Sequence, residues 1–135
     1  MANTAYPPSE KLTCLQVEVT TSCNLSCPEC SRTLLTAKGL WRNRHMPVEM
    51  FAGIVALTPP AQMLIAQGVG EPTLHPGFLE MLETAKASGK FGANLFYTNG
   101  LARSVAYYLG ILKAGLADFI LSLDSLDPAV AEACR

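Results

Sequence analysis

The sequence predicts an α/β fold built on a parallel sheet. Segments of strand character alternate with segments of helical spacing, in the order β-α-β-α-β-α-β followed by a short final helix. Chains that alternate in this way form parallel strands joined by right-handed crossovers. The polar segments that carry cysteine, glycine and carboxylate residues each follow a predicted strand, where parallel α/β folds bind their ligands. Periodicity alone leaves open a barrel and a doubly wound open sheet.

Four strands are expected from the apolar pattern. Residues 15–20 alternate apolar and polar side chains with a period of two, which is the signature of a strand. The short apolar run at 63–66 fits a strand that is covered on both faces. Two further strands are expected at 93–97 and 119–123.

Apolar residues at helical spacing predict three helices between these strands, and a fourth follows the last strand. Pro47 fits the first position of the first helix, and Gly89 and Gly115 fit the position after the end of the next two. Asp127 and Pro128 are a suitable N-cap and first residue for the fourth. The positions expected to face the core are Met50, Phe51, Ile54 and Leu57, then Phe78, Met81, Leu82 and Ala85, then Val105, Tyr108, Leu109 and Leu112.

The composition excludes several classes of protein. The chain has 135 residues, of which 50% are hydrophobic and 16% charged, so it suits one ordered domain at 12–135 after a flexible lead-in at 1–11. A net charge of −1 without a basic cluster argues against nucleic-acid binding. No apolar run is long enough for a membrane span, and the start lacks the features of a secretory signal, so we expect a cytoplasmic protein. Five cysteines in a reducing compartment favour metal or redox chemistry over disulfides.

The segment 21–45 shows no sustained period, and we expect a long loop with a short helix after Cys30. Within it, Cys23, Cys27 and Cys30 form a C-x3-C-x2-C triplet whose thiolates can converge on one metal centre. Three ligands leave one coordination position open, or leave one iron of a four-iron cluster without a protein ligand. A structural zinc site completed by His45 and three unconnected cysteines are the alternatives.

This triplet directly after a first strand resembles the cysteine motif of the radical S-adenosylmethionine (radical SAM) enzymes. Three further segments fit the same family in order. They are Gly70-Glu71-Pro72, which is similar to the Gly-Gly-Glu motif, Thr98-Asn99-Gly100, and Ser122-Leu123-Asp124-Ser125. The last two are similar to segments of the molybdenum-cofactor cyclases and the SPASM-type maturases. The resemblance extends from about residue 12 to the last residue.

The resemblance implies a partial (β/α)6 barrel, of which this chain would hold about four βα units in truncated form. It implies that Cys23, Cys27 and Cys30 bind a [4Fe–4S] cluster and that SAM chelates the fourth iron. A flavodoxin- or ferredoxin-like protein would supply the electron that cleaves SAM, and the resulting 5′-deoxyadenosyl radical would abstract hydrogen from an unknown substrate. The stretch from Gly68 to Pro76 slightly favours a peptide or protein maturase over a small-molecule cyclase. A non-catalytic metal-binding or interaction domain is the alternative.

The resemblance also assigns cofactor contacts to the two loops that follow the first two strands. Gly70 matches the glycine whose backbone approaches the SAM amino group, so Gly70→Val is expected to weaken SAM binding without unfolding the chain. Glu71 matches the acidic residue of that motif and is expected to fix the loop or to complement the next helix. Glu29 occupies a position by the adenine that is commonly aromatic in the family, and Val69 replaces the first glycine of Gly-Gly-Glu.

Three later positions are further candidates. Ser122 matches a serine that hydrogen-bonds SAM, with a strand-end hydroxyl bonded to backbone as the alternative. Thr98 and Asn99 match a segment near SAM or substrate, although Asn-Gly is also an ordinary turn signal. Asp124 fits a loop brace as well as a ligand contact.

The remaining polar and sulfur-containing residues have simpler interpretations. His45 and His75 are expected to be solvated loop histidines. Trp41 is expected to cover the cluster or the barrel rim, and Cys14 to be a buried small apolar residue. Cys134 lies near the last residue, and two isolated cysteines cannot build a second cluster.

Overall fold

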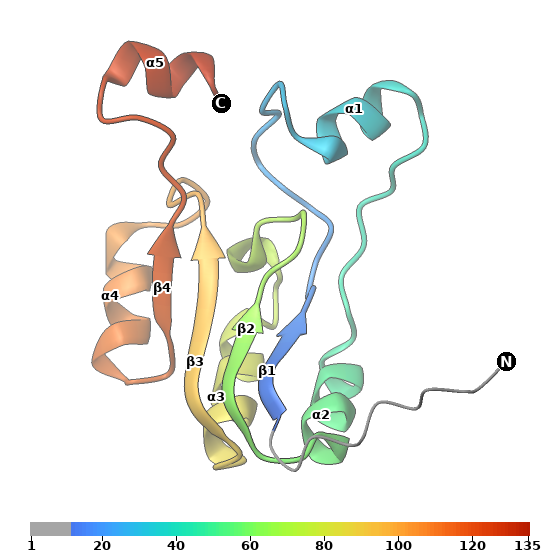
Figure 1. Ribbon diagram of the computed structural model, residues 1–135, viewed down its shortest axis with the longest axis vertical. Helices are drawn as coiled ribbons and strands as arrows, with labels where there is room; N and C mark the ends of the chain where they lie inside the picture. Colours follow the sequence, from blue (N-terminus) through green and yellow to red (C-terminus); the bar gives the residue numbers. More distant parts are fainter. Residues whose placement is uncertain (1–11) are drawn as a thin grey trace, which may run out of the picture.

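The computed structural model describes residues 12–135, and the predicted lead-in at 1–11 lies outside the described residues. Four parallel strands form one sheet in the order β1-β2-β3-β4 (Figure 1). They are β1 (Leu12–Val17), β2 (Ala61–Ala66), β3 (Phe91–Thr98) and β4 (Asp118–Leu121). Because all four run in the same direction, their carboxyl ends meet at one edge of the sheet.

The helices divide into two groups by position. Three connect consecutive strands and pack against the sheet: α2 (Val48–Leu57), α3 (Phe78–Ala87) and α4 (Val105–Lys113). Two lie beyond the carboxyl edge of the sheet, α1 (Ser31–Ala37) and α5 (Pro128–Ala133) (Figure 1). A short 3-10 helix, η1 (Pro72–Leu74), follows β2. None of the helices within residues 12–135 combines the length and apolar character needed to cross a bilayer.

The helices cover one face of the sheet, which distinguishes a barrel wall from a doubly wound sheet. On the covered face the strands contribute Val17, Leu64 and Phe96 to a core that the three connecting helices complete. The opposite face carries residues paired in register, such as Ile65 beside Leu95, and these are only half-buried. The structure therefore confirms the predicted parallel α/β fold and its barrel-like arrangement.

All four strands begin one to three residues before the predicted starts, and two of them also end early. β1 ends at Val17, three residues before the predicted end, and β4 ends at Leu121 rather than at 123. The chain after β1 pairs instead with the segment before α2, because the Met46 N–H donates to the Val19 carbonyl and Thr20 bridges His45 in antiparallel fashion. This long-range pairing has no signal in the local apolar pattern.

The predicted core-facing residues are correct for α3 and only partly correct for the other two helices. Phe78, Met81, Leu82 and Ala85 are all buried, and Gly89 has the positive φ expected after the helix end. In α2 the buried residues are Phe51 and Val55, whereas the predicted Met50 and Leu57 are exposed. In α4 they are Tyr108 and Ile111, whereas Val105, Leu109 and Leu112 are exposed.

The predicted helix starts also need one correction. Pro47 is the N-cap of α2 rather than its first residue. The start of α5 is as predicted, because the Asp127 side chain accepts a hydrogen bond from the Ala129 N–H and Pro128 is the first helical residue.

The centre of the core gives a stability prediction. Phe96 is fully buried, with its ring 5.1 Å from that of Phe78 and 5.6 Å from that of Phe119 between centroids. We expect Phe96→Ala to lower the free energy of unfolding by about 3–5 kcal/mol, because it removes buried contacts and leaves a cavity. Urea denaturation followed by circular dichroism measures this. The control Val105→Ala, at a side chain that is 74% exposed, should change stability by less than about 0.5 kcal/mol, and equal losses in both variants would contradict the assignment of Phe96 to the core.

Candidate functional site

An open cavity of about 210 Å³ lies at the carboxyl edge of the sheet. Its lining comes from the loops after β1, β2 and β3, from the end of β4 and from the last residue of the chain. Almost all the predicted site residues line it together: Cys23, Cys27, Cys30, Gly70, Glu71, Thr98, Asn99 and Ser122. Glu29 does not line this cavity. It lines an adjacent pocket together with Cys134.

Cys27 and Cys30 lie on a turn that leads into α1, and Cys23 precedes this turn on the loop after β1. The Cys30 N–H donates to the Cys27 carbonyl at 3.1 Å, and all three thiols are free and half-buried. Among residues 12–135, no three histidine, cysteine or acidic side chains are arranged to hold a single metal ion. The three thiols share one cavity, and their convergence on one metal centre stays a prediction.

The sulfur of Cys23 is surrounded by hydrogen-bond donors. The Leu25 N–H lies 3.5 Å from Cys23 Sγ, and the side-chain amide of Asn99 lies 3.9 Å from it. Hydrogen bonds of this kind stabilise a thiolate and tune the potential of iron–sulfur clusters. The cysteine loop and the loop after β3 therefore both contribute a donor to Cys23.

Glu71 is buried and joins three parts of the site. Its Oε1 accepts hydrogen bonds from the Thr73 N–H, the Thr73 hydroxyl at 2.6 Å and the Thr98 hydroxyl at 2.8 Å. Its Oε2 accepts from the Asn99 N–H at 2.8 Å, and its own N–H donates to the Ser22 carbonyl. The carboxylate thus fixes the loops after β2 and β3 to each other, and its backbone fixes both to the loop after β1.

This network continues into the core through α4. The hydroxyl of Tyr108 lies 3.2 Å from that of Thr98, and the Thr98 oxygen also accepts from the Gly100 N–H. Burial raises the pKa of the neighbouring phenol of Tyr107 above its ordinary value, so that ring stays uncharged at neutral pH. The loop after β3 is therefore held from both the cavity side and the core side.

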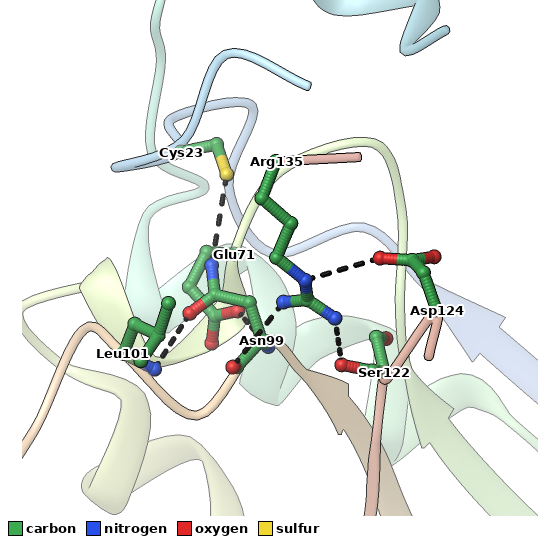
Figure 2. Close-up of polar contacts among 7 residues, drawn as sticks. All are labelled: Cys23, Glu71, Asn99, Leu101, Ser122, Asp124 and Arg135. Carbon is green, nitrogen blue, oxygen red and sulfur yellow. Dashed lines mark hydrogen bonds and ion pairs between the residues drawn. The ribbon is translucent and has the colours of Figure 1, made fainter. Parts of the chain in front are cut away.

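Asn99 is the residue that connects the cysteine loop to the end of the chain (Figure 2). Its side-chain amide donates to Asn24 Oδ1 at 2.9 Å and its side-chain oxygen accepts from the Leu101 N–H. Its carbonyl accepts from the guanidinium of Arg135 at 3.5 Å. The predicted turn at Asn99-Gly100 is present, and Asn99 also faces the cavity.

Arg135 braces the end of β4. Its guanidinium pairs with Asp124 at 3.1 Å and donates to the Ser122 carbonyl (Figure 2). The Ser122 N–H donates to the Thr98 carbonyl, so backbone contacts position Ser122 while its side chain remains exposed. Asp124 therefore acts as the loop brace that was one of its two interpretations.

Two glycines allow the loops after β1 and β2 to approach closely. A Cβ on Gly70 would lie 2.1 Å from the Thr20 carbonyl oxygen, which is backbone and cannot rotate away. A Cβ on Gly68 would overlap the side chain of Glu18, whose Oε1 accepts from the Val69 N–H at 2.6 Å. The expectation that Gly70→Val leaves the fold intact is therefore wrong, because any side chain at Gly70 separates the two loops.

The histidines and Trp41 lie outside the cavity. His45 Nδ1 is 2.9 Å from the Thr20 hydroxyl, so His45 does not complete a zinc site with the cysteines. His75 is buried rather than solvated: its Nε2 donates to the Met46 carbonyl at 2.7 Å and its Nδ1 accepts from the Gly77 N–H. The Trp41 indole donates to the Thr21 carbonyl and packs along the loop after β1.

The two remaining cysteines lie apart from the triplet. Cys14 is half-buried on β1 rather than fully buried, and Cys134 is exposed.

Sequence reasoning missed three charged residues that shape the site: Glu18, Arg32 and Arg135. Glu18 lies in the alternating segment after β1, and Arg32 is the second residue after Cys30. The sequence did hold one signal for Glu18: it is a charged residue at the end of the alternating segment, directly before the loop that carries the cysteines. The contacts of Arg32 and Arg135 are with backbone carbonyls and had no signal in the sequence.

A substitution at Gly70 tests whether this glycine is needed because the Thr20 carbonyl lies against it or because glycine is flexible. We expect Gly70→Ala to lower the free energy of unfolding by about 1–3 kcal/mol, because the new methyl group collides with the Thr20 carbonyl. Thermal and urea denaturation measure the change. Gly110→Ala in α4 is the matched control, since no atom lies within 4 Å of its Cβ and alanine should stabilise the helix by about 0.5–1 kcal/mol. Stabilisation by both substitutions would contradict the close approach.

Glu71 gives a second prediction. Glu71→Gln replaces one carboxylate oxygen by an NH2 group that cannot accept a hydrogen bond, so either the bond from the Asn99 N–H or the bonds from Thr73 and Thr98 are lost, and we expect a loss of about 1.5–3 kcal/mol in the free energy of unfolding. The exposed Glu83→Gln should stay within about 0.5 kcal/mol of the unsubstituted chain in the same urea titration. A Glu71→Gln variant as stable as Glu83→Gln would show that the network does not stabilise the fold.

Two curated proteins are similar to this chain in sequence. The first is the tungsten-containing aldehyde ferredoxin oxidoreductase cofactor-modifying protein of Pyrococcus furiosus, at 29% identity over 120 residues, covering 85% of this chain and 32% of the relative. The second is the GTP 3′,8-cyclase of Chlorobaculum tepidum, at 31% identity over 122 residues, covering 84% of this chain and 33% of the relative. The chain thus spans about a third of the length of these relatives.

Solved structures show the same fold. The crystal structure of BtrN in complex with AdoMet and 2-DOIA superposes with a TM-score of 0.62 at 17% identity, covering 82% of this chain and 45% of that one. The structure of anSMEcpe with bound AdoMet gives a TM-score of 0.63 at 22% identity, covering 86% of this chain and 33% of that one. The sequence model of the radical SAM superfamily matches residues 17–135, which include the whole cysteine triplet and every loop that lines the cavity. The chain therefore belongs to the radical SAM superfamily, whose enzymes use a [4Fe–4S] cluster and S-adenosylmethionine.

Proposed function

We propose that the cavity at the carboxyl edge of the sheet binds a [4Fe–4S] cluster through Cys23, Cys27 and Cys30 and binds SAM beside it. The observation that carries the proposal is that three free thiols share one cavity with the glycine loop after β2 and with Asn99 and Ser122. The donor set fits the cluster better than a single ion. A zinc ion needs all its ligands about 2–2.3 Å from one point, whereas a cubane cluster distributes its thiolates over different irons.

The chain's own residues would bind and orient the two groups. Cys23, Cys27 and Cys30 would supply the thiolates, and the N–H groups of Leu25 and Asn99 would orient the sulfur of Cys23. When bound, the cluster supplies the electron that cleaves SAM into methionine and the 5′-deoxyadenosyl radical. Gly70 would present backbone rather than a side chain to the cavity, and Glu71 would keep that loop fixed against Thr98.

The contacts of Thr98, Asn99, Ser122 and Glu29 with SAM differ in their support. Asn99 and Ser122 line the cavity with polar side chains, which supports a direct contact. The Thr98 hydroxyl is committed to Glu71, so its role is to position the loop. Glu29 is exposed and lines the adjacent pocket rather than this cavity, so its contact with SAM has the least support.

Partners and substrate belong to the same proposal. We propose an electron donor protein of the flavodoxin or ferredoxin kind, because the cluster must be reduced before SAM can be cleaved, and we propose that the reaction takes place in the cytoplasm. The Gly68–Pro76 stretch favours a peptide or protein substrate, whereas the two curated relatives are named as a cyclase and a cofactor-modifying protein. The preference for a peptide therefore stays a prediction.

The cluster assignment is tested by reconstituting the chain with iron and sulfide without oxygen. We expect a brown protein with absorbance near ~400 nm and about four irons and four sulfides per chain. Cys27→Ser should lose the cluster, whereas Cys14→Ser and Cys134→Ser, which alter cysteines outside the triplet, should keep it. Full iron content in Cys27→Ser, or a colourless chain with one zinc, would refute the proposal.

The SAM assignment is tested on the same material. Reconstituted chain should bind SAM, and an Asn99→Ala variant should bind it more weakly while keeping its iron. Dithionite-driven formation of 5′-deoxyadenosine measures cleavage directly. A brown, reconstituted chain that binds no SAM would favour the non-catalytic metal-binding domain instead.

A further inference from the structure

Arg32 is a buried cation beside the cysteine loop. Its side chain belongs to the first turn of α1 and is only 9% exposed. Arginine is almost never buried without a partner, because an unpaired charge is costly in a low-dielectric environment. The position therefore needs an explanation from its surroundings.

The guanidinium is used on the backbone of the cysteine loop. Its Nη2 donates to the Cys23 carbonyl at 2.8 Å and its Nη1 donates to the Leu25 carbonyl at 3.3 Å. These two bonds fix the loop between the first and second cysteines. Its Nε is buried and has no hydrogen-bond partner among the described residues.

No acidic group of the described chain balances this charge. The one ion pair within residues 12–135 joins Arg135 to Asp124, at the other side of the cavity. Along the sequence, every charged residue between Glu29 and Glu49 is basic, and these are Arg32, Lys38, Arg42 and Arg44. Within residues 12–135, therefore, no acidic side chain supplies a directly paired negative charge.

On the proposed function, that negative charge is the cluster with its three thiolates, and we infer that Arg32 is its counter-charge. Arg32 does not line the cavity, so it acts through the loop as a positioning residue. It holds the carbonyls of Cys23 and Leu25 in place and favours the reduced cluster, which carries one more electron than the oxidised cluster. A fixed positive charge stabilises the more negative state more strongly, and burial limits screening of that effect by salt.

The test compares the reduction potential of the cluster in the reconstituted chain with its potential in Arg32→Gln and in Arg32→Lys. The potential is measured by anaerobic redox titration, in which absorbance reports how much of the cluster is reduced. In Arg32→Gln we expect the ratio of reduced to oxidised cluster at a fixed potential to fall on the order of tenfold, or about 59 mV for a one-electron couple. Arg32→Lys keeps the positive charge, so its ratio of reduced to oxidised cluster should stay close to that of the unsubstituted chain. Arg103→Gln is the matched control, because Arg103 also donates to a backbone carbonyl but is exposed and away from the cavity.

Each result decides between the charge and a purely structural role. A wild-type potential in Arg32→Gln, or equal shifts in the glutamine and lysine variants, overturns the inference. If Arg32→Gln takes up no iron, uptake by Arg32→Lys at the wild-type potential supports the inference, and failure of both variants overturns it. Failure of the unsubstituted chain to take up a cluster would instead refute the proposed function, so the two failures are distinguishable.

Discussion

The arrangement of the site depends on the buried carboxylate of Glu71. Parallel strands bring their carboxyl ends to one edge, but the loops that follow them are irregular and need contacts of their own to hold a fixed position. Glu71 supplies four hydrogen bonds to the loop after β3 and to η1, and its backbone bonds to the loop that carries the cysteines. The donors to this carboxylate are N–H and O–H groups rather than a cation, and within residues 12–135 Glu71 forms no ion pair with Arg32 or Arg135.

The loops after β1 and β2 approach each other closely because two positions between them are glycines and carry no side chain. Gly70 lies against the Thr20 carbonyl, and Gly68 leaves room for the Glu18 carboxylate above the N–H of Val69. This explains why a valine is tolerated at Val69, between two glycines, where the family commonly has glycine. Val69 is 38% exposed and lines the cavity, so the close approaches on either side of it involve the two glycines.

The sequence was sufficient for the order of elements, for the core-facing side of α3 and for the cysteine loop, because each depends on spacing within one segment. It was insufficient where the answer depends on a distant segment. β1 ends early because residues after it pair with the chain before α2, and His75 is buried because the Met46 carbonyl lies against it. In α4 the apolar residues are too numerous for the pattern to select Ile111 over Leu109 and Leu112, and packing on the sheet decides.

The charges around the cavity have separate tasks because they differ in burial. Arg135 pairs with an exposed Asp124, a contact that contributes little to stability and can rearrange when a ligand enters. Arg32 is buried and bonds only to carbonyls, so its charge stays available to whatever occupies the cysteine loop. Glu71 is buried and fully bonded, so it fixes geometry. Glu71 lines the same cavity as the three cysteines, but both oxygens of its carboxylate accept hydrogen bonds from Thr73, Thr98 and Asn99, so the buried charged group whose bonds go to the cysteine loop is Arg32.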